Sequence, residues 1–158
     1  MLARARSRRR LYLVGIVLAL LVFLAISAVL ARVLSIDGTE RSAITVLIKD
    51  EATGNRSAMI SRIQGCADNA ACRARVATDA ASLRRSGAIS ILQLQPSAGF
   101  SLTSTVGTAR VAWRAGSSLP IVQCVRVRRA GDALSGFRVE LLRLSRRIAS
   151  DSNCPRQY

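Results

Sequence analysis

Apolar residues are concentrated near the N-terminus, where residues 11–31 form a run of 21 positions without a charge. The run is rich in Leu, Val, Ile and Ala, and its apolar character continues through Val33 and Leu34. A helix of this length spans roughly 30 Å, which matches the hydrocarbon core of a bilayer. We therefore predict a transmembrane helix over residues 11–34. An arginine-rich cytoplasmic tail, residues 1–10, precedes it, and an extracytoplasmic α+β domain, residues 35–158, follows it.

The charges beside the apolar run predict its orientation. Five arginines lie between Arg4 and Arg10, whereas only Arg32 and Arg41 follow the run closely. Because positive residues favour the cytoplasmic side, the N-terminus is expected in the cytoplasm. The alternative is a cleaved signal peptide, with small-residue sites at 25–27 and 27–29, but such a peptide has an apolar core of only about 7 to 15 residues. We therefore expect an uncleaved, single-pass anchor in the plasma membrane.

Beyond the membrane segment, apolar residues recur at helical spacing. Asp37 and Glu40 have the spacing of a capping box, which predicts that a new helix begins just outside the membrane. Its apolar positions are Ile44, Leu47, Ile48 and Ala52. The Thr-Gly-Asn sequence at 53–55 predicts a break.

Two further helices are expected before residue 87. The first is short and runs through Met59 to Gly65. The second can be capped by Asp68 or Asn69 and is expected to stop at Gly87. Its apolar stripe consists of Cys72, Val76, Ala80 and Leu83.

After Gly87 the period of the apolar residues changes from 3.6 to 2, which predicts strands joined by turns. In the run that Pro96 ends, Gln93 has the same parity as Ile89 and Ile91. Turns are expected at 116–118 and from 131. The later runs place seven apolar residues on one face of the sheet: Val111, Trp113, Val125, Val127, Phe137, Val139 and Leu141. Helices must cover this face, so we predict helices packed on an antiparallel sheet of about four strands.

This order of elements resembles the cone-shaped α+β superfamily of nuclear transport factor two and ketosteroid isomerase, especially its membrane-anchored bacterial envelope members. The likeness covers residues from about 38 to 150. It rests on the Gly54-Asn55 break, Val-x-Trp at 111–113 and Val-x-Val-x-Arg at 125–129. It implies a cystatin-like cone, with two or three helices on a curved sheet. The isomerase activity is not implied, because that branch uses acidic groups inside the cone and the inward strand positions here carry none.

Four cysteines, Cys66, Cys72, Cys124 and Cys154, lie in the domain expected outside the cytoplasm, where disulfides persist. Of the three complete pairings, we favour Cys66 with Cys72 and Cys124 with Cys154. The first would close the loop between the second and third helices, and the second would tie the C-terminal tail to a strand. A zinc site is the alternative, but the five-residue spacing and the absence of histidine do not favour it.

Basic residues exceed acidic ones, with 24 Lys+Arg against 9 Asp+Glu. Lysine occurs once, at Lys49, and this bias toward arginine is a weak sign of a GC-rich bacterial genome. Five arginines have outward parity on the strands: Arg110, Arg114, Arg126, Arg128 and Arg138. If the strands are neighbours, these residues form a basic face. An anionic envelope polymer, lipid headgroups or an acidic protein would suit such a face. The alternative is a solvated face that resists aggregation.

Nucleic acid is not an expected partner, because the domain faces away from the cytoplasm and the arginines lack interleaved aromatic residues. No catalytic or cofactor-binding constellation appears in the sequence, so the chain is not expected to be an enzyme and no cofactor is predicted. The first hypothesis is a membrane-anchored extracytoplasmic binding or assembly module of the bacterial cell envelope.

The alternative is a small-ligand-binding or enzymatic cone domain that uses its interior pocket. Its candidate polar residues, Gln93, Gln123 and Asp79, are scattered along the chain. An interior filled by Trp113, Phe137 and Leu141 would favour the binding module. An open, polar cavity would favour the alternative.

Overall fold

The computed structural model describes residues 2–97, 103–132, 136–149 and 153–155. Within these residues the helices are α1 (Leu2–Thr53), α2 (Arg56–Arg62) and α3 (Ala70–Ser82). The strands are β1 (Ile89–Gln95), β2 (Thr105–Ala115), β3 (Ile121–Asp132) and β4 (Gly136–Leu144). The strands form one open antiparallel sheet in the order β1-β2-β3-β4. The predicted α+β class, with helices first and an antiparallel meander after them, is confirmed.

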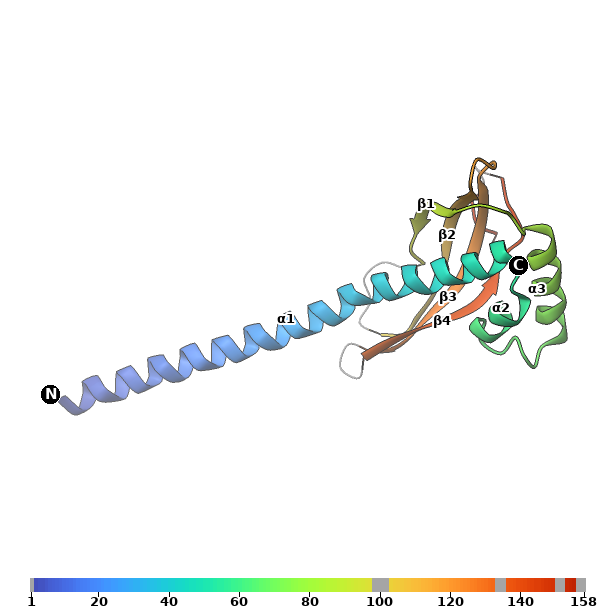
Figure 1. Ribbon diagram of the computed structural model, residues 1–158. Helices are drawn as coiled ribbons and strands as arrows, with labels where there is room; N and C mark the ends of the chain where they lie inside the picture. Colours follow the sequence, from blue (N-terminus) through green and yellow to red (C-terminus); the bar gives the residue numbers. More distant parts are fainter. Residues whose placement is uncertain (1, 98–102, 133–135, 150–152, 156–158) are drawn as a thin grey trace.

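The first helix, α1, is continuous over 52 residues, which corresponds to a length of roughly 78 Å. Its N-terminal half projects away from the domain, and its C-terminal part lies across the sheet (Figure 1). The prediction that a new helix begins at Asp37 is therefore wrong. Residues 35–40 contain no proline, and an established helix gains one hydrogen bond for each residue added, so α1 propagates through this region.

The break after α1 and the caps of the two short helices follow the expected chemistry. Gly54 adopts a φ of +75° directly after the last residue of α1. The side chain of Asn55 caps α2 by accepting a hydrogen bond from the N–H of Ala58, at 3.2 Å. Asn69 caps α3 in the same way by accepting from the N–H of Cys72, at 3.0 Å.

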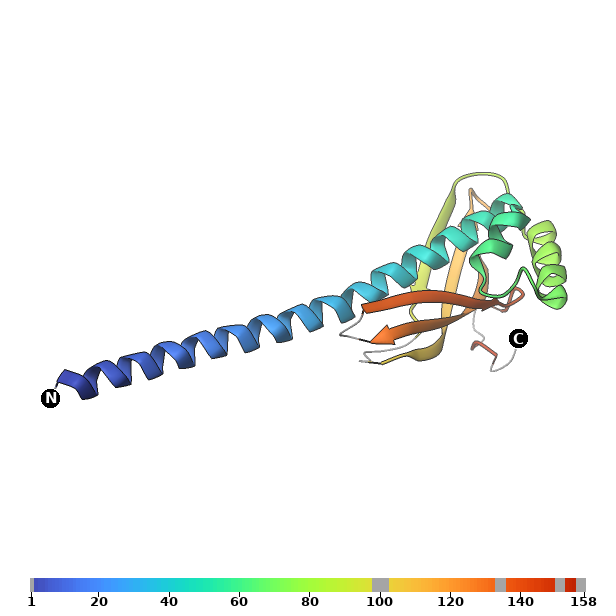
Figure 2. The same cartoon turned by 90° about the horizontal axis from the view of Figure 1, so that it is seen from below.

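The end of α3 differs from the prediction, because the helix stops at Ser82 and not at Gly87. Directly after it, the N–H of Arg85 donates to the carbonyl of Ala52, at 2.9 Å, which holds the chain against the end of α1. Gly87 instead lies where two backbone segments pass close together. It has a φ of +103°, and a Cβ atom added there would lie only 3.2 Å from the nitrogen of Gly116. Both short helices lie at the end of the sheet remote from the N-terminus (Figure 2).

The inner face of the sheet carries the seven apolar residues predicted for it. Five of them are buried: Val111, Trp113, Val125, Val127 and Leu141. Phe137 and Val139 are partly exposed. The prediction for β1 needs a correction, because a bulge between Ile91 and Gln93 reverses the alternation and turns Leu94 inward and Gln93 outward.

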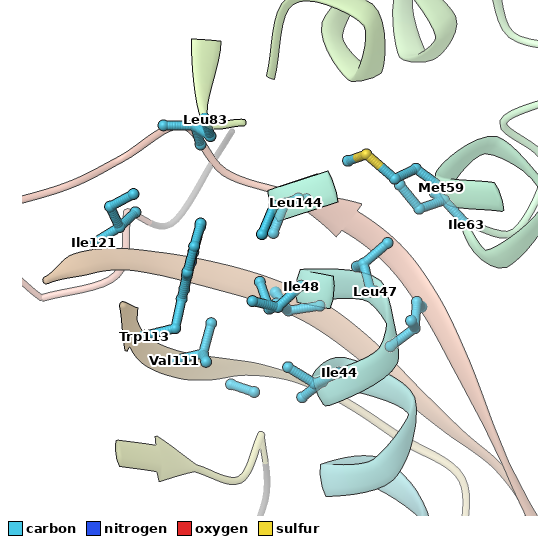
Figure 3. Packing of buried hydrophobic residues seen from close by; sticks show 14 of the residues in the cluster. Ile44, Leu47, Ile48, Met59, Ile63, Leu83, Val111, Trp113, Ile121 and Leu144 are labelled. Carbon is cyan, nitrogen blue, oxygen red and sulfur yellow. The ribbon is translucent and has the colours of Figure 1, made fainter. Parts of the chain in front are cut away.

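The core forms where the apolar stripe of α1 meets this inner face. Ile44, Leu47 and Ile48 are fully buried against residues of the sheet. Trp113 rises from β2 toward Leu83, with Ile48 and Ile121 beside it (Figure 3). The interior of the domain is thus filled by packed side chains.

Candidate functional site

The long apolar stretch of the molecule lies in the N-terminal half of α1. Among the described residues, α1 is the one helix long and apolar enough to cross a membrane, with a mean hydropathy of 3.1 over its most apolar window. Most of its large apolar side chains from Tyr12 to Leu30 are exposed, as is Leu34, and none of the most apolar window packs against the domain. A membrane span or a signal sequence accounts for such a helix.

The junction between this apolar segment and the domain is abrupt. Leu34 is 68% exposed, whereas Ile36, two residues later in the same helix, is 4% exposed. Helical geometry separates their Cα atoms by only about 3 Å along the axis. The domain therefore begins within one helical turn of the apolar segment.

A buried ionic cluster fixes α1 to the sheet at this junction. Arg129 of β3 points inward, and its Nε donates to the carboxylate of Glu40, at 2.8 Å. The same guanidinium pairs with Asp37. Glu40 also accepts hydrogen bonds from the N–H and the hydroxyl of Ser97, at 2.6 and 3.0 Å. We call Asp37, Glu40, Ser97 and Arg129 the junction cluster.

A second polar network lies deeper in the core. Trp113 donates from Nε1 to Oε1 of Gln123, at 2.8 Å, and Gln123 donates from Nε2 to Oε1 of Glu51, at 2.9 Å. Gln123 also donates to the carbonyl of Ser145, at 3.2 Å. Burial raises the pKa of Glu51 to about 8; the bond from Gln123 acts in the opposite direction, and the charge of Asp79 raises the pKa further. This network ties α1 to β2 and β3.

The five arginines of outward parity lie on the outer face of the sheet, opposite the helices. The strands that carry them, β2, β3 and β4, are neighbours, so the condition for a shared basic face is met. We call Arg110, Arg114, Arg126, Arg128 and Arg138 the outer arginine face.

One acidic residue partly neutralises the outer arginine face. Glu140 pairs with Arg128, at 3.3 Å, and with Arg138, at 2.9 Å. The hydrogen bond from Arg138 lowers the pKa of Glu140. A sixth arginine, Arg143 of β4, also points outward. Arg126 pairs with Arg143 and Val127 pairs with Leu141, so a bulge in β4 shifts the alternation between them. Simple alternation from Leu141 would have placed Arg143 inward.

The C-terminal segment is tied to β3. Both predicted disulfides, Cys66–Cys72 and Cys124–Cys154, are present. Cys124 and Val122 have outward parity yet are buried: Cys124 is bonded to Cys154, and the N–H of Ile148 donates to the carbonyl of Val122, at 2.8 Å. Each bond contributes about 2 to 4 kcal/mol in the chain-entropy model. Two disulfides suggest a domain outside the cytoplasm.

The three polar residues considered for an interior pocket do not converge. Gln93 is exposed on the outer face, and Gln123 is fully buried in the network with Glu51. Asp79, on α3, lines a pocket of about 290 Å³ between α3, the loop before it and the end of β4. Within the described parts of the chain, no group of three or more Cys, Asp or Glu side chains is arranged to hold a metal ion.

Sequence reasoning missed the junction cluster and Glu51, although both left a signal. Arg129 has the inward parity of Val125 and Val127, and an inward arginine requires an acidic partner. Glu51 follows Ile44, Leu47 and Ile48 on the same helical stripe, which places a carboxyl group in the core.

Comparisons of the chain with protein-family models, with curated proteins and with solved structures found no match.

Proposed function

We propose that the protein is a non-enzymatic binding or assembly module of a bacterial cell envelope, held in the plasma membrane by α1 with its domain outside. The observation that carries the proposal is the continuity of α1, because one helix supplies both the apolar segment and the central element of the core. A domain joined in this way stays close to the bilayer surface in a defined orientation. A freely diffusing binding protein or enzyme has no need of that constraint.

The filled interior also favours a binding module over a cone domain that works through a central cavity. Of the three residues expected to fill it, Trp113 and Leu141 are buried against the stripe of α1, whereas Phe137 is partly exposed. The surface left for a partner is then the outer one, where the exposed Arg114, Arg128 and Arg138 offer guanidinium groups for carboxylates or phosphates. The likeness to membrane-anchored cone domains of the envelope agrees with this role, and an acidic envelope protein or an anionic envelope polymer is the partner we expect.

Topology is the first part of the proposal to test. Intact cells are treated with a membrane-impermeant thiol reagent, with and without prior reduction, and the mass of the purified chain is measured. We expect four cysteines to react only after reduction, on a chain that retains Arg4 to Arg10. Cysteines that react only after lysis, without reduction, would place the domain in the cytoplasm and overturn the proposal.

Partner binding is tested by photo-crosslinking in living cells from Arg114 on the outer face, with Arg84 beyond α3 as the control position. We expect crosslinked products from Arg114 that are lost when Arg110 and Arg126 are replaced by glutamine. A matched variant with Arg56 and Arg85 replaced by glutamine should keep them. Equal products from Arg84, or products unaffected by Arg110→Gln and Arg126→Gln, would contradict a role for the outer arginine face.

A further inference from the structure

A pocket of about 290 Å³ lies beside α3 at the edge of the packed core, and Ile63, Val76 and Leu144 belong to both. Its walls come from the loop between α2 and α3, from the inward side of α3 and from the end of β4. Polar residues line it from all three walls, and apolar residues line it from the end of β4: Gln64, Asn69, Arg75, Asp79 and Arg143, with Leu142 and Leu144. The pocket therefore combines an apolar wall with charged groups, as small-molecule sites do.

Asp79 is the most unusual group in this pocket. It is 4% exposed, and no hydrogen bond to its carboxylate is found in the part of the chain that the structure describes. Burial raises the pKa of this carboxyl group, and the nearby positive charges of Arg75 and Arg146 act in the opposite direction. Such a group in a cavity is a candidate partner for a ligand that brings a cation or a donor.

Arg75 lies one helical turn before Asp79 and lines the same pocket. Residues at this spacing face the same side of a helix, with Cβ atoms about 5 to 6 Å apart. No close ion pair joins the two described side chains, although the charge of Arg75 acts on Asp79. The pocket therefore presents a negative and a positive group side by side, each able to take a partner of opposite charge.

The loop that forms the rim is held in one shape. Cys66 and Cys72 both line the pocket and are joined by a disulfide across six residues. Asn69, between them, is fixed by its cap bond to Cys72. A rim held in this way loses little conformational entropy when a ligand binds.

We propose that this pocket binds a small zwitterion, a free α-amino acid, with the ammonium group on Asp79 and the carboxylate on Arg75. The ammonium supplies the donors that Asp79 lacks, and the planar guanidinium suits a carboxylate. The side chain of the amino acid then lies against Ile63, Val76 and Leu144, which also line the pocket. The carboxylate of Asp79 lies in a pocket that Arg75 and Arg143 also line, so a ligand that carries both charges suits it better than a simple cation or anion.

The test uses the full-length chain in detergent micelles and follows the backbone amide signals of Gly65 and Asn69. Each of the twenty common amino acids is titrated to about 10 mM, a range that detects dissociation constants near 1 mM. The amino acid that binds is then compared with its N-acetylated form, which lacks the ammonium, and with its amide, which lacks the carboxylate. We expect saturable shifts with at least one amino acid and a more than tenfold weaker response to both capped forms.

Variants locate the binding. Asp79→Asn and Arg75→Gln should each weaken it more than tenfold, whereas Asp68→Asn, an exposed acid in the same loop that does not line the pocket, should leave it unchanged. Retained amide dispersion and two intact disulfides show that a variant is folded, and Arg75, being exposed, serves if Asp79→Asn does not fold. The proposal is overturned if no amino acid shifts these signals, if a capped form binds as well, or if binding survives Arg75→Gln.

Discussion

Glu51 lies on the apolar stripe of α1, with one carboxyl oxygen bonded to Gln123 and the other, Oε2, without a partner among the described residues. Its pKa is raised from an ordinary value of 4.5 to about 8, mainly by burial. Below about pH 4.5, both the folded and the unfolded chain hold the proton. Between about 4.5 and 8 only the folded chain holds it, so the free energy of unfolding falls as pH rises, by up to about 1.4 kcal/mol per pH unit.

We expect Glu51→Gln to remove this pH dependence. The glutamine keeps an oxygen that can accept from Gln123, but it does not ionise. The variant should therefore exceed the wild type in free energy of unfolding by roughly 2 to 4 kcal/mol near pH 8 and approach it near pH 4.5. Urea unfolding across this range measures the difference, and parallel curves for the two proteins would contradict the burial of an unpaired carboxyl group.

Arg129 provides a second prediction for a single residue. Arg129→Met should lower the free energy of unfolding by about 3 to 5 kcal/mol, because it leaves the fully buried Glu40 without its cation. Arg128→Met, one residue away on the opposite face, should change it by less than about 0.5 kcal/mol. The two variants are compared by denaturant unfolding. Similar losses from both would mean that the junction cluster does not depend on charge pairing.

At the scale of the element, α1 contains a residue of low helix propensity, Gly38. Gly38 lies in the helix close to the junction, and a Cβ atom there would meet nothing within 4 Å. Gly38→Ala should therefore raise the free energy of unfolding by about 0.5 to 1 kcal/mol. Gly54→Ala is the matched control and should lower it, because Gly54 has a φ of +75° and its Cβ position is 3.2 Å from Cδ of Arg84. Thermal unfolding of both variants in detergent gives the comparison, and a loss at Gly38 would contradict a regular helix at this point.

Periodicity predicted the elements well, because apolar spacing and turn residues are local signals. The break at Gly54, the cap at Asn69 and the inward position of Trp113 all follow from a few neighbouring residues. The errors came from choices that distant residues decide. Asp37 and Glu40 have the spacing of a helix start, yet they pair with Arg129, which lies about ninety residues later in the chain.

The two β-bulges caused the remaining errors, in the predicted faces of the strands. Gln93 and Arg143 each follow a bulge that shifts the alternation by one residue, and no local signal marked either bulge. For the candidate site, the outward arginines of β2 and β3 followed from parity alone. The pocket beside α3 did not, because Asp79, Arg75 and the end of β4 meet only after the sheet has formed.

At the scale of the whole molecule, the proposed membrane anchor and the continuity of α1 together decide which end of the domain would lie near the bilayer. The start of β4 and the end of β3 lie on the side from which α1 arrives, whereas the turn between β2 and β3 lies at the remote end (Figure 1). In nanodiscs that contain lipids spin-labelled at the headgroup, the amide signals of Gly131 and Phe137 should broaden strongly. Those of Gly116 and Ser118 should broaden little. Equal broadening at both ends would indicate a domain that tumbles relative to its anchor.

Because the helix is unbroken between Leu34 and Ile36, the number of residues at this point determines both the distance and the rotation of the domain relative to the apolar segment. Each residue added to a helix advances it by about 1.5 Å and rotates it by about 100°. A single insertion between the two residues would therefore rotate the domain, with the outer arginine face, about the helix axis by more than a quarter turn relative to the apolar segment. The contacts within the domain would stay intact. An insertion of seven residues, close to two full turns, would restore the direction in which the face points. It would also move the domain about 10 Å farther from the apolar segment along the helix axis. The spacing thus sets separately the height at which a partner meets the domain and the direction from which it approaches.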